Sequence, residues 1–472
     1  MRDSHLAESK QSIGLLAAVF QRVAGGIIFP ALFAVSLFHF AAVGAHQFLL
    51  ADTSSAALIA VLFVVQAAFM IFLFKTPQDS GSCSRKILML HHVQPIIFTL
   101  IFLSIQMLMV GLRGFERLMS LVEDPQSFAY YSLALRISDP ATYVDEWLAL
   151  MQVPLLHWGG HLATHFPGYP LLIYTGFYVF GRSPHSVIML VTALSALAIL
   201  PLYYLAREAY GPNAATLSCI LYSWIPSISL DLPYMDLTAA VFILSSILLF
   251  LKSQQEGKSP YSFFGGILLF LATFLTFVSM AALVIVLIMA AWSDELRCAA
   301  SRLFYFICGL IIPYVLLQLL FGMPFLEAAS WAFRTNWWFH QHLYSLSPTV
   351  WSMEYSTVLF FVLLGFPTFL IFLGVNLRVL KSLIRGSAVN VLTLGISLML
   401  LLTVTVARLE LTRVAVFSTP FIAACTAAEA TWKTSRSMIV DSLLLSSAQY
   451  LETFTYLSQA TLLSRILGYP VA

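Results

Sequence analysis

The longest polar interval in the first half of the sequence ends with the stretch His157-Trp158-Gly159-Gly160-His161-Leu162-Ala163-Thr164-His165-Phe166-Pro167-Gly168. This interval begins at Glu123 and separates two parts of the chain that are almost wholly apolar. Of the 472 residues, 60% are hydrophobic and only 10% are charged, compared with about 25% charged in an average globular domain. Such a composition is typical of multi-span membrane proteins. We therefore expect the polar interval to form a long loop at one face of a membrane.

Charge, cysteine content and motifs exclude several functional classes. The net charge is +2 and no polybasic tract occurs, so nucleic acid is not expected as a partner. The five cysteines form no CxxC pair, which argues against a zinc site and a disulfide framework. No G-x-x-x-x-G-K-[ST] motif occurs, which argues against bound ATP as an energy source.

Apolar runs of about 17 to 25 residues predict an all-α polytopic membrane protein with about thirteen transmembrane helices. The run from 170 to 181 is too short to span a membrane and is expected to be a re-entrant or interfacial segment packed against protein. The expected spans are 23–43, 56–75, 93–112, 186–208, 212–230, 235–252, 260–276, 278–293, 302–322, 355–377, 388–407, 414–431 and 438–459.

The distribution of positive charge predicts the orientation of the chain. With these spans, two thirds of the 24 lysines and arginines, including every lysine, fall on the N-terminal side of the membrane. The positive-inside rule then places the N-terminus in the cytoplasm. The two long loops, 113–185 and 323–354, would face the extracytoplasmic side, where together they could cap a cavity. Aromatic residues crowd the second loop, as expected at the level of the lipid headgroups.

Helical spacing within the first loop predicts a short helix on the membrane surface. Tyr143, Trp147 and Leu150 would share its apolar face. Asp145 and Glu146 would then be its polar flank rather than a catalytic pair.

Acidic residues at two outer turns are candidates for catalysis. Glu123 and Asp124 follow the span 93–112, and either carboxylate could act as a general base toward a hydroxyl. The alternative is that both are solvated loop residues. Asp236 opens a predicted helix after a short turn that begins at Asp231. Its carboxylate could bind a metal or polarise an acceptor, or it could only stabilise the helix N-terminus.

Three histidines in the quoted stretch allow two interpretations. His157, His161 and His165 recur every four residues, which on a helix would give the arrangement of metal ligands. Gly159 and Gly160 disfavour a regular helix there. A histidine that contacts an anionic group is therefore favoured over a zinc site.

A second charged group lies close to membrane depth, in the string Ala407-Arg408-Leu409-Glu410-Leu411-Thr412-Arg413. Ionisable residues in such places are costly and are usually functional or paired. Arg413 could bind a phosphate, whose geometry the guanidinium fork matches, or it could form an ion pair with Glu410. Arg334, in the aromatic loop 323–354, is a further candidate for binding phosphate.

Three segments resemble motifs of one enzyme superfamily. Asp124-Pro-Gln-Ser-Phe-Ala-Tyr-Tyr-Ser-Leu-Ala resembles the acidic first-loop motif of GT-C superfamily glycosyltransferases. Thr164-His165-Phe166-Pro167-Gly168-Tyr169-Pro170 resembles the threonine-histidine-proline-proline-glycine signature of the bacterial branch related to protein O-mannosyltransferases (glycosyltransferase family 39-like), with Phe166 in place of the first proline. Arg408-Leu-Glu410-Leu-Thr-Arg413, followed by Pro420, is similar to the late arginine-glutamate-arginine stretch of that branch.

The resemblance implies roles for individual residues. Asp124 would be the catalytic carboxylate of the first loop, with Glu123 competing for that position, and Asp236 would be the acidic residue of the second loop. His165 and Arg413 would contact the phosphate of a lipid-linked donor, and Arg334 is the weaker phosphate candidate from its place in the aromatic loop. Supporting roles fall to Glu410, His161 and Tyr131.

The resemblance also implies substrates and a location. A polyprenyl-phosphate sugar would be the donor and a lipid, glycan or protein the acceptor, in contact with membrane lipids at the extracytoplasmic face of the plasma (inner) membrane. No cofactor is required, although two separated aspartates permit a divalent metal, Mg²⁺ or Mn²⁺.

The expected organisation of the chain has three parts. Residues 1–92 would hold an N-terminal cytoplasmic tail and two extra spans, 93–460 the GT-C-like catalytic core, and 461–472 a C-terminal tail.

Two other functional classes are compatible with a multi-span chain. A secondary transporter or lipid flippase would favour internal repeats and ionisable groups near the bilayer midplane, and the sequence shows no clear repeat. A catalytically inactive relative with a role in assembly is the second.

Overall fold

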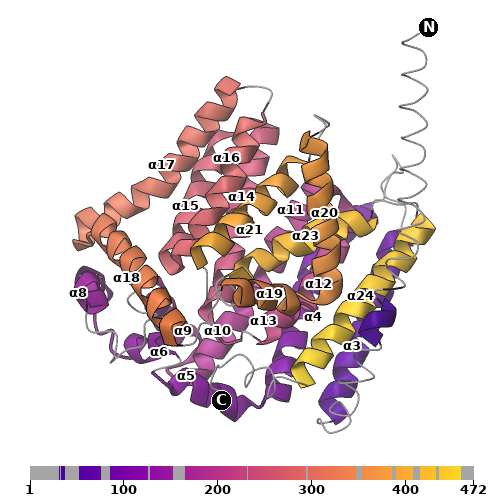
Figure 1. The fold of residues 1–472 in the computed structure, drawn as a ribbon, viewed down its shortest axis with the longest axis horizontal. Helices are drawn as coiled ribbons and strands as arrows, with labels where there is room; N and C mark the ends of the chain where they lie inside the picture. Colours follow the sequence, from indigo (N-terminus) through magenta and orange to yellow (C-terminus); the bar gives the residue numbers. More distant parts are fainter. Residues whose placement is uncertain are drawn as a thin grey trace.

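A computed structural model shows a bundle of helices, with no strand among the residues that it describes (Figure 1). The all-α fold expected from the apolar runs is confirmed. The described residues are 31, 33–37, 53–75, 85–125, 128–152, 165–230, 232–293, 296–346, 353–384, 390–407, 415–431 and 435–458.

Several helices are long and apolar enough to cross a bilayer, which makes the chain a multi-span membrane protein. Five of the described helical segments meet both conditions. They are Val93–Arg113, Pro184–Tyr210, Met235–Glu256, Arg297–Phe321 and Phe366–Ile384. Further apolar helices, of 10 to 17 residues, are Ala60–Phe74, Ser259–Leu275, Phe277–Ala291 and Val391–Thr403.

The elements of the first half include the helices of the long polar interval. Those before and within it are α3 Thr53–Lys75, α4 Arg85–Arg113, α5 Phe115–Glu123, α6 Ala129–Ala134, α7 Pro140–Asp145 and α8 Trp147–Gln152. Those that follow are α9 Gly168–Phe180, α10 Pro184–Leu197, α11 Ile199–Tyr210, α12 Pro212–Ser223, α13 Pro226–Leu230, the 3₁₀ helix η3 Met235–Thr238 and α14 Ala239–Glu256.

The second half continues the bundle. Its elements are α15 Ser259–Leu275, η4 Phe277–Ala282, α16 Leu283–Ala291, α17 Leu296–Phe321, α18 Phe325–Leu346, α19 Met353–Leu363, α20 Phe366–Ile384, α21 Val391–Ala407, η6 Ala415–Ser418, α23 Thr419–Thr431 and α24 Ser435–Ser458. Figure 1 shows α5, α6 and α9 together at the lower end of the bundle, which we call the site end.

Glycines bring α15 and α17 into backbone contact. A Cβ atom on Gly266 would lie 2.0 Å from the carbonyl oxygen of Phe306, and one on Gly309 would lie 2.0 Å from that of Phe263. Small residues at such crossings let transmembrane helices pack closely. The C-terminal end of α15 is thereby fixed at the site end, where α9 packs against it.

Two predicted spans are each interrupted in the structure. The run 212–230 is divided into α12 and α13, and the run 355–377 is divided between α19 and α20. Backbone groups at such breaks need hydrogen-bond partners because lipid supplies none. Gln449 of α24 supplies a hydrogen-bond donor at both breaks. Its Nε2 donates to the carbonyl oxygens of Trp224 at 3.2 Å and Leu364 at 3.1 Å.

Replacing Gln449 with leucine is expected to destabilise the fold. The carbonyls of Trp224 and Leu364 would each lose a donor, and although Trp224 keeps the hydroxyl of Thr453, a buried polar group that loses its partner costs about 1–3 kcal/mol. The apparent melting temperature of the purified protein should fall. Gln318→Leu makes the same change at an exposed position of α17 and should leave it unchanged; equal melting temperatures for the two variants would contradict the assigned role of Gln449.

Two expectations about the polar loops are corrected by the structure. The interval 323–354 is not a loop throughout, because it contains α18. The predicted surface helix is two short helices, α7 and α8, and its aromatic face is directed into the protein: Tyr143 and Trp147 are 9% and 1% exposed. Asp145 and Glu146 are exposed, which agrees with a polar flank.

Candidate functional site

Four buried polar residues from separate segments meet at the site end, and we call them the Tyr130 cluster. Tyr130 lies in α6, His165 precedes α9, Tyr169 is in the first turn of α9, and Asp236 lies in η3. Their side chains are at most 5% exposed. Among residues with apolar surroundings, such a group of ionisable and hydroxyl side chains is a candidate active site.

Ring contacts join three members of this cluster. The ring of Tyr130 lies edge-on to His165 at a centroid distance of 5.9 Å and to Tyr169 at 5.1 Å. The rings of His165 and Tyr169 are 5.7 Å apart. These are the edge-to-face and tilted geometries that aromatic pairs favour, so the imidazole is held in place by the two phenol rings.

A hydrogen bond attaches the fourth member. The hydroxyl of Tyr169 donates to Oδ1 of Asp236 at 3.1 Å, in a place where both side chains are buried. Hydrogen bonds to carboxylates are stronger than those between neutral groups, and low local polarity strengthens them further. Asp236 is therefore anchored to α9 as well as to its own segment, which is more than helix capping requires.

The conformation of the segment before α9 is determined by close packing. A Cβ atom on Gly168 would lie 2.2 Å from the backbone oxygen of Phe274, so only glycine fits where α9 begins. The indole of Trp147 donates to the carbonyl of His165 at 3.2 Å. Phe166, which occupies the position of a proline in the resembled signature, packs against Phe277 in a tilted geometry with ring centroids 4.0 Å apart. Glycine, tryptophan and phenylalanine together fix the backbone on both sides of His165.

The first-loop carboxylates lie at the end of α5 and differ in environment. Glu123 is the last residue of α5 and is exposed, whereas Asp124 follows it and is half-buried. The backbone NH of Asp124 donates to the carbonyl of Ser120, and its carbonyl accepts from Phe128, at 2.8 Å. The ring of Phe128 in turn packs edge-on against Tyr130 at 5.8 Å, so Asp124 is joined through one residue to the cluster.

Tyr131 follows Tyr130 in α6 and makes no ring contact with His165 or Tyr169 among the described contacts. Its ring packs against Phe177 of α9. Burial raises the pKa of Tyr131, the nearby carboxylate of Glu123 raises it further, and Arg182 opposes both effects. Glu123 is thus close enough to Tyr131 to raise the pKa of its hydroxyl.

Several predicted site residues are not joined to the cluster by the described part of the structure. Arg334 is exposed on α18, which packs against α8. Arg413, Glu410 and His161 lie outside the described residues. The element that follows Arg413 in the chain, η6, packs against η3, the element that carries Asp236.

Two members of the cluster were not predicted as site residues. Tyr130 adjoins Tyr131 in the sequence, and the pattern gave no reason to prefer one over the other. Tyr169 follows the quoted stretch, where an aromatic residue at the start of an apolar run is ordinary at a membrane interface. Their tertiary contacts distinguish them.

Within the described residues, no group of three or more His, Cys, Asp and Glu side chains has a geometry that could hold a metal ion. The zinc interpretation of the histidines cannot be compared with the structure beyond His165, because His157 and His161 lie outside the described residues.

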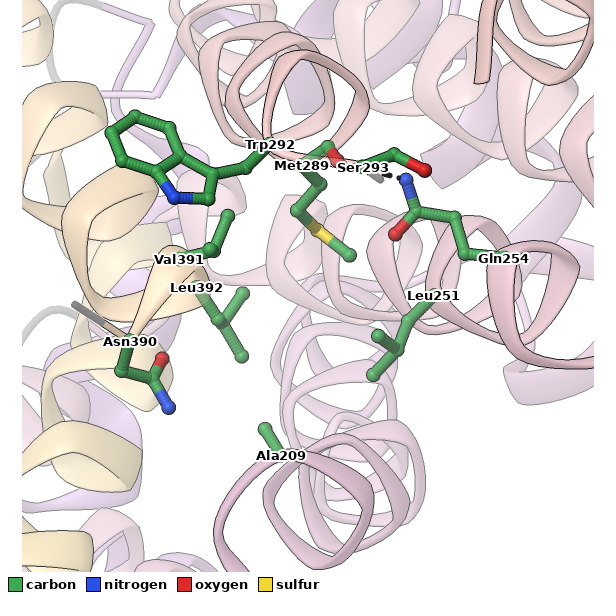
Figure 2. Close-up of a pocket in the computed structure, with 9 residues that line it drawn as sticks. All are labelled: Ala209, Leu251, Gln254, Met289, Trp292, Ser293, Asn390, Val391 and Leu392. Atoms are coloured by element: carbon green, nitrogen blue, oxygen red, sulfur yellow. Dashed lines mark hydrogen bonds between the residues drawn. The ribbon is translucent and has the colours of Figure 1, made fainter. Parts of the chain in front are cut away.

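A pocket of about 330 Å³ lies away from this cluster, between the ends of α11, α14 and α16 and the start of α21 (Figure 2). Its lining includes Gln254, whose Nε2 donates to the carbonyl of Met289 at 2.9 Å, and no charged side chain. Gln254 follows Asp236 by 18 residues, and at about 1.5 Å of rise per helical residue the two lie roughly 27 Å apart along η3 and α14. The pocket is therefore near the opposite end of the bundle from the Tyr130 cluster.

Comparison with protein families and solved structures supports a glycosyltransferase fold. Residues 164–321 match the family described as dolichyl-phosphate-mannose-protein mannosyltransferase, and this segment contains His165, Tyr169 and Asp236. The apo oligosaccharyltransferase of Archaeoglobus fulgidus is similar in structure, with a TM-score of 0.50 and 14% identity over 78% of this chain and 56% of that one. This chain thus corresponds to little more than half of the archaeal enzyme, and the likeness is one of fold.

Two further solved structures are more distant. The same archaeal enzyme in complex with zinc and sulfate gives a TM-score of 0.47 with 14% identity, over 77% of this chain and 53% of that one. ArnT from Cupriavidus metallidurans, bound to undecaprenyl phosphate, gives 0.45 with 12% identity, over 71% of this chain and 77% of that one. No curated protein sequence matched the chain.

Proposed function

We propose that this multi-span membrane protein is a GT-C glycosyltransferase, which transfers a sugar from a polyprenyl-phosphate-linked donor to an acceptor hydroxyl; the family match over residues 164–321 and the likeness in fold support this. The observation that carries the proposal is the Tyr130 cluster. In this cluster the hydroxyl of Tyr169 binds Asp236, and the ring of His165 contacts Tyr130 of the first loop. The description of the matching family names dolichyl-phosphate-mannose, which is a polyprenyl-phosphate sugar.

Asp124 is the proposed general base. It is half-buried, so it has the freedom to take a proton from an acceptor, whereas the Asp236 carboxylate is held by the hydroxyl of Tyr169, which suits a group that orients rather than one that accepts a proton. The Asp124 carboxylate would take the proton of the acceptor hydroxyl as its oxygen attacks the anomeric carbon. Attack opposite the bond to the lipid phosphate inverts the configuration of the sugar. Glu123 is the alternative base, and its exposure and its proximity to Tyr131 disfavour that role.

The leaving phosphate needs positive charge or hydrogen-bond donors in a water-poor site. His165 is proposed to contact it, because its imidazole is buried and is held by two phenol rings at the site end. Arg413 and, less directly, Arg334 are proposed as cationic partners, with Glu410, His161 and Tyr131 in support. Asp236 would orient the acceptor or a divalent ion, with no metal required for the steps above.

The positive-inside distribution supports an orientation with the site end outside the cytoplasm. The N-terminus would then be cytoplasmic, and the donor would be presented at the outer face of the plasma membrane. A lipid, glycan or protein acceptor is compatible with this location. The proposed catalytic core is 93–460, preceded by two extra spans and a tail in 1–92 and followed by a tail in 461–472.

A transporter or lipid flippase is the second candidate function, and one observation favours it. Asp441 and Glu452 of α24 are 5% and 1% exposed, in the run 438–459 that the sequence predicts as a span. Buried acidic residues at membrane depth often belong to ion or substrate pathways. The glycosyltransferase is preferred because the matched family segment coincides with the Tyr130 cluster rather than with α24.

Liposomes that contain the purified protein can distinguish the two functions. With labelled polyprenyl-phosphate mannose and a mixture of lipid and peptide acceptors, the glycosyltransferase should produce labelled acceptor and free lipid phosphate. Counterflow of a solute or movement of the labelled lipid between leaflets, without any transfer of sugar, would identify a transporter or flippase instead.

Tyr169→Phe is expected to slow sugar transfer by about 10- to 100-fold. The change removes the donor to Asp236, and a hydrogen bond to a charged group contributes about 1.5–3 kcal/mol. Initial rates at saturating donor would measure the loss. Tyr174→Phe is the matched control, because Tyr174 lies in the same helix and its hydroxyl shares a hydrogen bond with that of the exposed Tyr178. Equal rates for the two variants would contradict a role for the Tyr169–Asp236 bond.

A further inference from the structure

Arg113, the last residue of α4, holds the backbone of the loop that leads to Asp236. Its Nη1 atom donates to the carbonyl oxygens of Ser229 at 2.8 Å and Leu232 at 2.6 Å. Ser229 belongs to α13, and Leu232 lies between α13 and η3, four residues before Asp236. One guanidinium nitrogen thus joins the end of a helix to the irregular segment that follows it.

A second residue of α4 supports the same contact. Gln106 lies seven residues before Arg113, which is two helical turns and therefore the same face of α4. Its Oε1 accepts a hydrogen bond from the hydroxyl of Ser229 at 3.1 Å, and its side chain is 1% exposed. Ser229 is therefore bonded to α4 through both its side chain and its carbonyl.

Arg113 also marks the start of the first loop. Gly114, with φ of 86°, turns the chain from α4 into α5, at whose end Asp124 lies. The left-handed conformation at Gly114 lets α5 begin directly after Arg113. The contacts of Arg113 consequently connect the segment that carries Asp124 with the segment that carries Asp236.

Irregular backbone within a membrane protein is stable only where its polar groups are satisfied by protein. The carbonyls of Ser229 and Leu232 receive a charged donor, which is the stronger kind of hydrogen bond. Without it, the segment between α13 and η3 would gain freedom to move, and the carboxylate of Asp236 would no longer be held at a fixed position opposite the hydroxyl of Tyr169.

We propose that Arg113 is a positioning residue: it fixes the loop between α13 and η3 so that Asp236 meets Tyr169, and it couples the two carboxylate-bearing segments. This role rests on the proposed glycosyltransferase function of the site. Arg113 acts through Asp236 and does not itself contact the substrate.

The first test is kinetic. Arg113→Met should lower kcat by about 100-fold, the size of effect that a displacement of about 1 Å can have at an active site, and should change the KM for the donor less than threefold. The kcat of Arg113→Lys should be about tenfold higher than that of Arg113→Met, because an ammonium group can donate to two carbonyls. Arg117→Met is the control, because Arg117 lies in the neighbouring α5 and belongs to none of the proposed machinery.

A double-mutant cycle distinguishes positioning from a general loss of stability. If Arg113 acts through Asp236, the double variant should have a kcat less than threefold below that of Asp236→Asn alone. Multiplicative effects of the two substitutions would overturn the inference. If Arg113→Met is not recovered as a folded protein, Arg113→Gln, which keeps a neutral donor, takes its place in the cycle.

Hydrogen exchange provides a readout that does not depend on activity. Amides of Leu232 and of residues 234–238 should exchange faster in Arg113→Met than in the wild type, whereas those of α15 should not change. Unchanged exchange in 232–238 would overturn the inference whatever the activity. Faster exchange combined with full activity of Asp236→Asn would instead reject the proposed catalytic role of Asp236, and with it the positioning role of Arg113, while leaving the loop contact established.

Discussion

Asp124→Asn is expected to lower the rate of sugar transfer by about 100- to 10,000-fold, the usual contribution of a general base. Asparagine keeps the size and the backbone contacts of the residue but cannot accept the acceptor's proton. Asp124 follows α5 and its backbone NH bonds to Ser120, so the substitution should leave the fold intact. Initial rates at saturating donor and acceptor, with the melting temperature measured in parallel, would establish the loss.

Glu123→Gln is the matched control for this prediction. It makes the same chemical change one residue earlier, at an exposed side chain near Tyr131. We expect its rate to stay within about threefold of the wild type, a difference of less than 1 kcal/mol. A large loss in Glu123→Gln with a normal rate in Asp124→Asn would exchange the two assignments, and normal rates in both would place the base elsewhere.

Gly168→Ala is expected to destabilise the protein and to abolish most of its activity. The added Cβ would lie 2.2 Å from the carbonyl oxygen and 2.7 Å from the carbonyl carbon of Phe274, and neither backbone atom can rotate away. Overpacking of this kind costs about 1–3 kcal/mol and more where backbone must move. Since α9 begins at Gly168, its displacement would also shift His165 and Tyr169 away from Tyr130 and Asp236.

The melting temperature and the transfer rate of Gly168→Ala should therefore both fall. Gly374→Ala is the control, because a Cβ on Gly374 in α20 would have no atom within 4 Å. A Gly168→Ala protein as stable and active as Gly374→Ala would show that α9 does not need the close approach to Phe274.

Hydrophobicity predicted most helices of this bundle but not their interruptions. The run 260–276 corresponds closely to the apolar helix α15 because a membrane requires continuous apolar helices. The run 438–459 overlaps α24, which is not one of the apolar helices of the described residues. The breaks after Ser223 and Leu363 were missed, since hydropathy contains no information about backbone hydrogen bonds. They depend on Gln449, which is far away in the sequence and bonds to both.

The candidate site was predicted in part. His165 and Asp236 were identified from motif and position, and the structure joins both to Tyr169. Tyr130 and Tyr169 were missed because aromatic residues are common in this chain and only tertiary contacts separate those in a site from those facing lipid. Arg113 was counted only as a charge, because its bonds to Ser229 and Leu232 span more than a hundred residues.

Release of polyprenyl phosphate by the purified protein is the most direct measurement of the proposed function. With a polyprenyl-phosphate sugar and an acceptor, wild-type protein should release lipid phosphate and glycosylated acceptor in equal amounts, and Asp124→Asn should release neither above background. Folded wild-type protein that releases no lipid phosphate from any of several polyprenyl-phosphate sugars, yet exchanges a solute or lipid across the bilayer, would contradict glycosyl transfer.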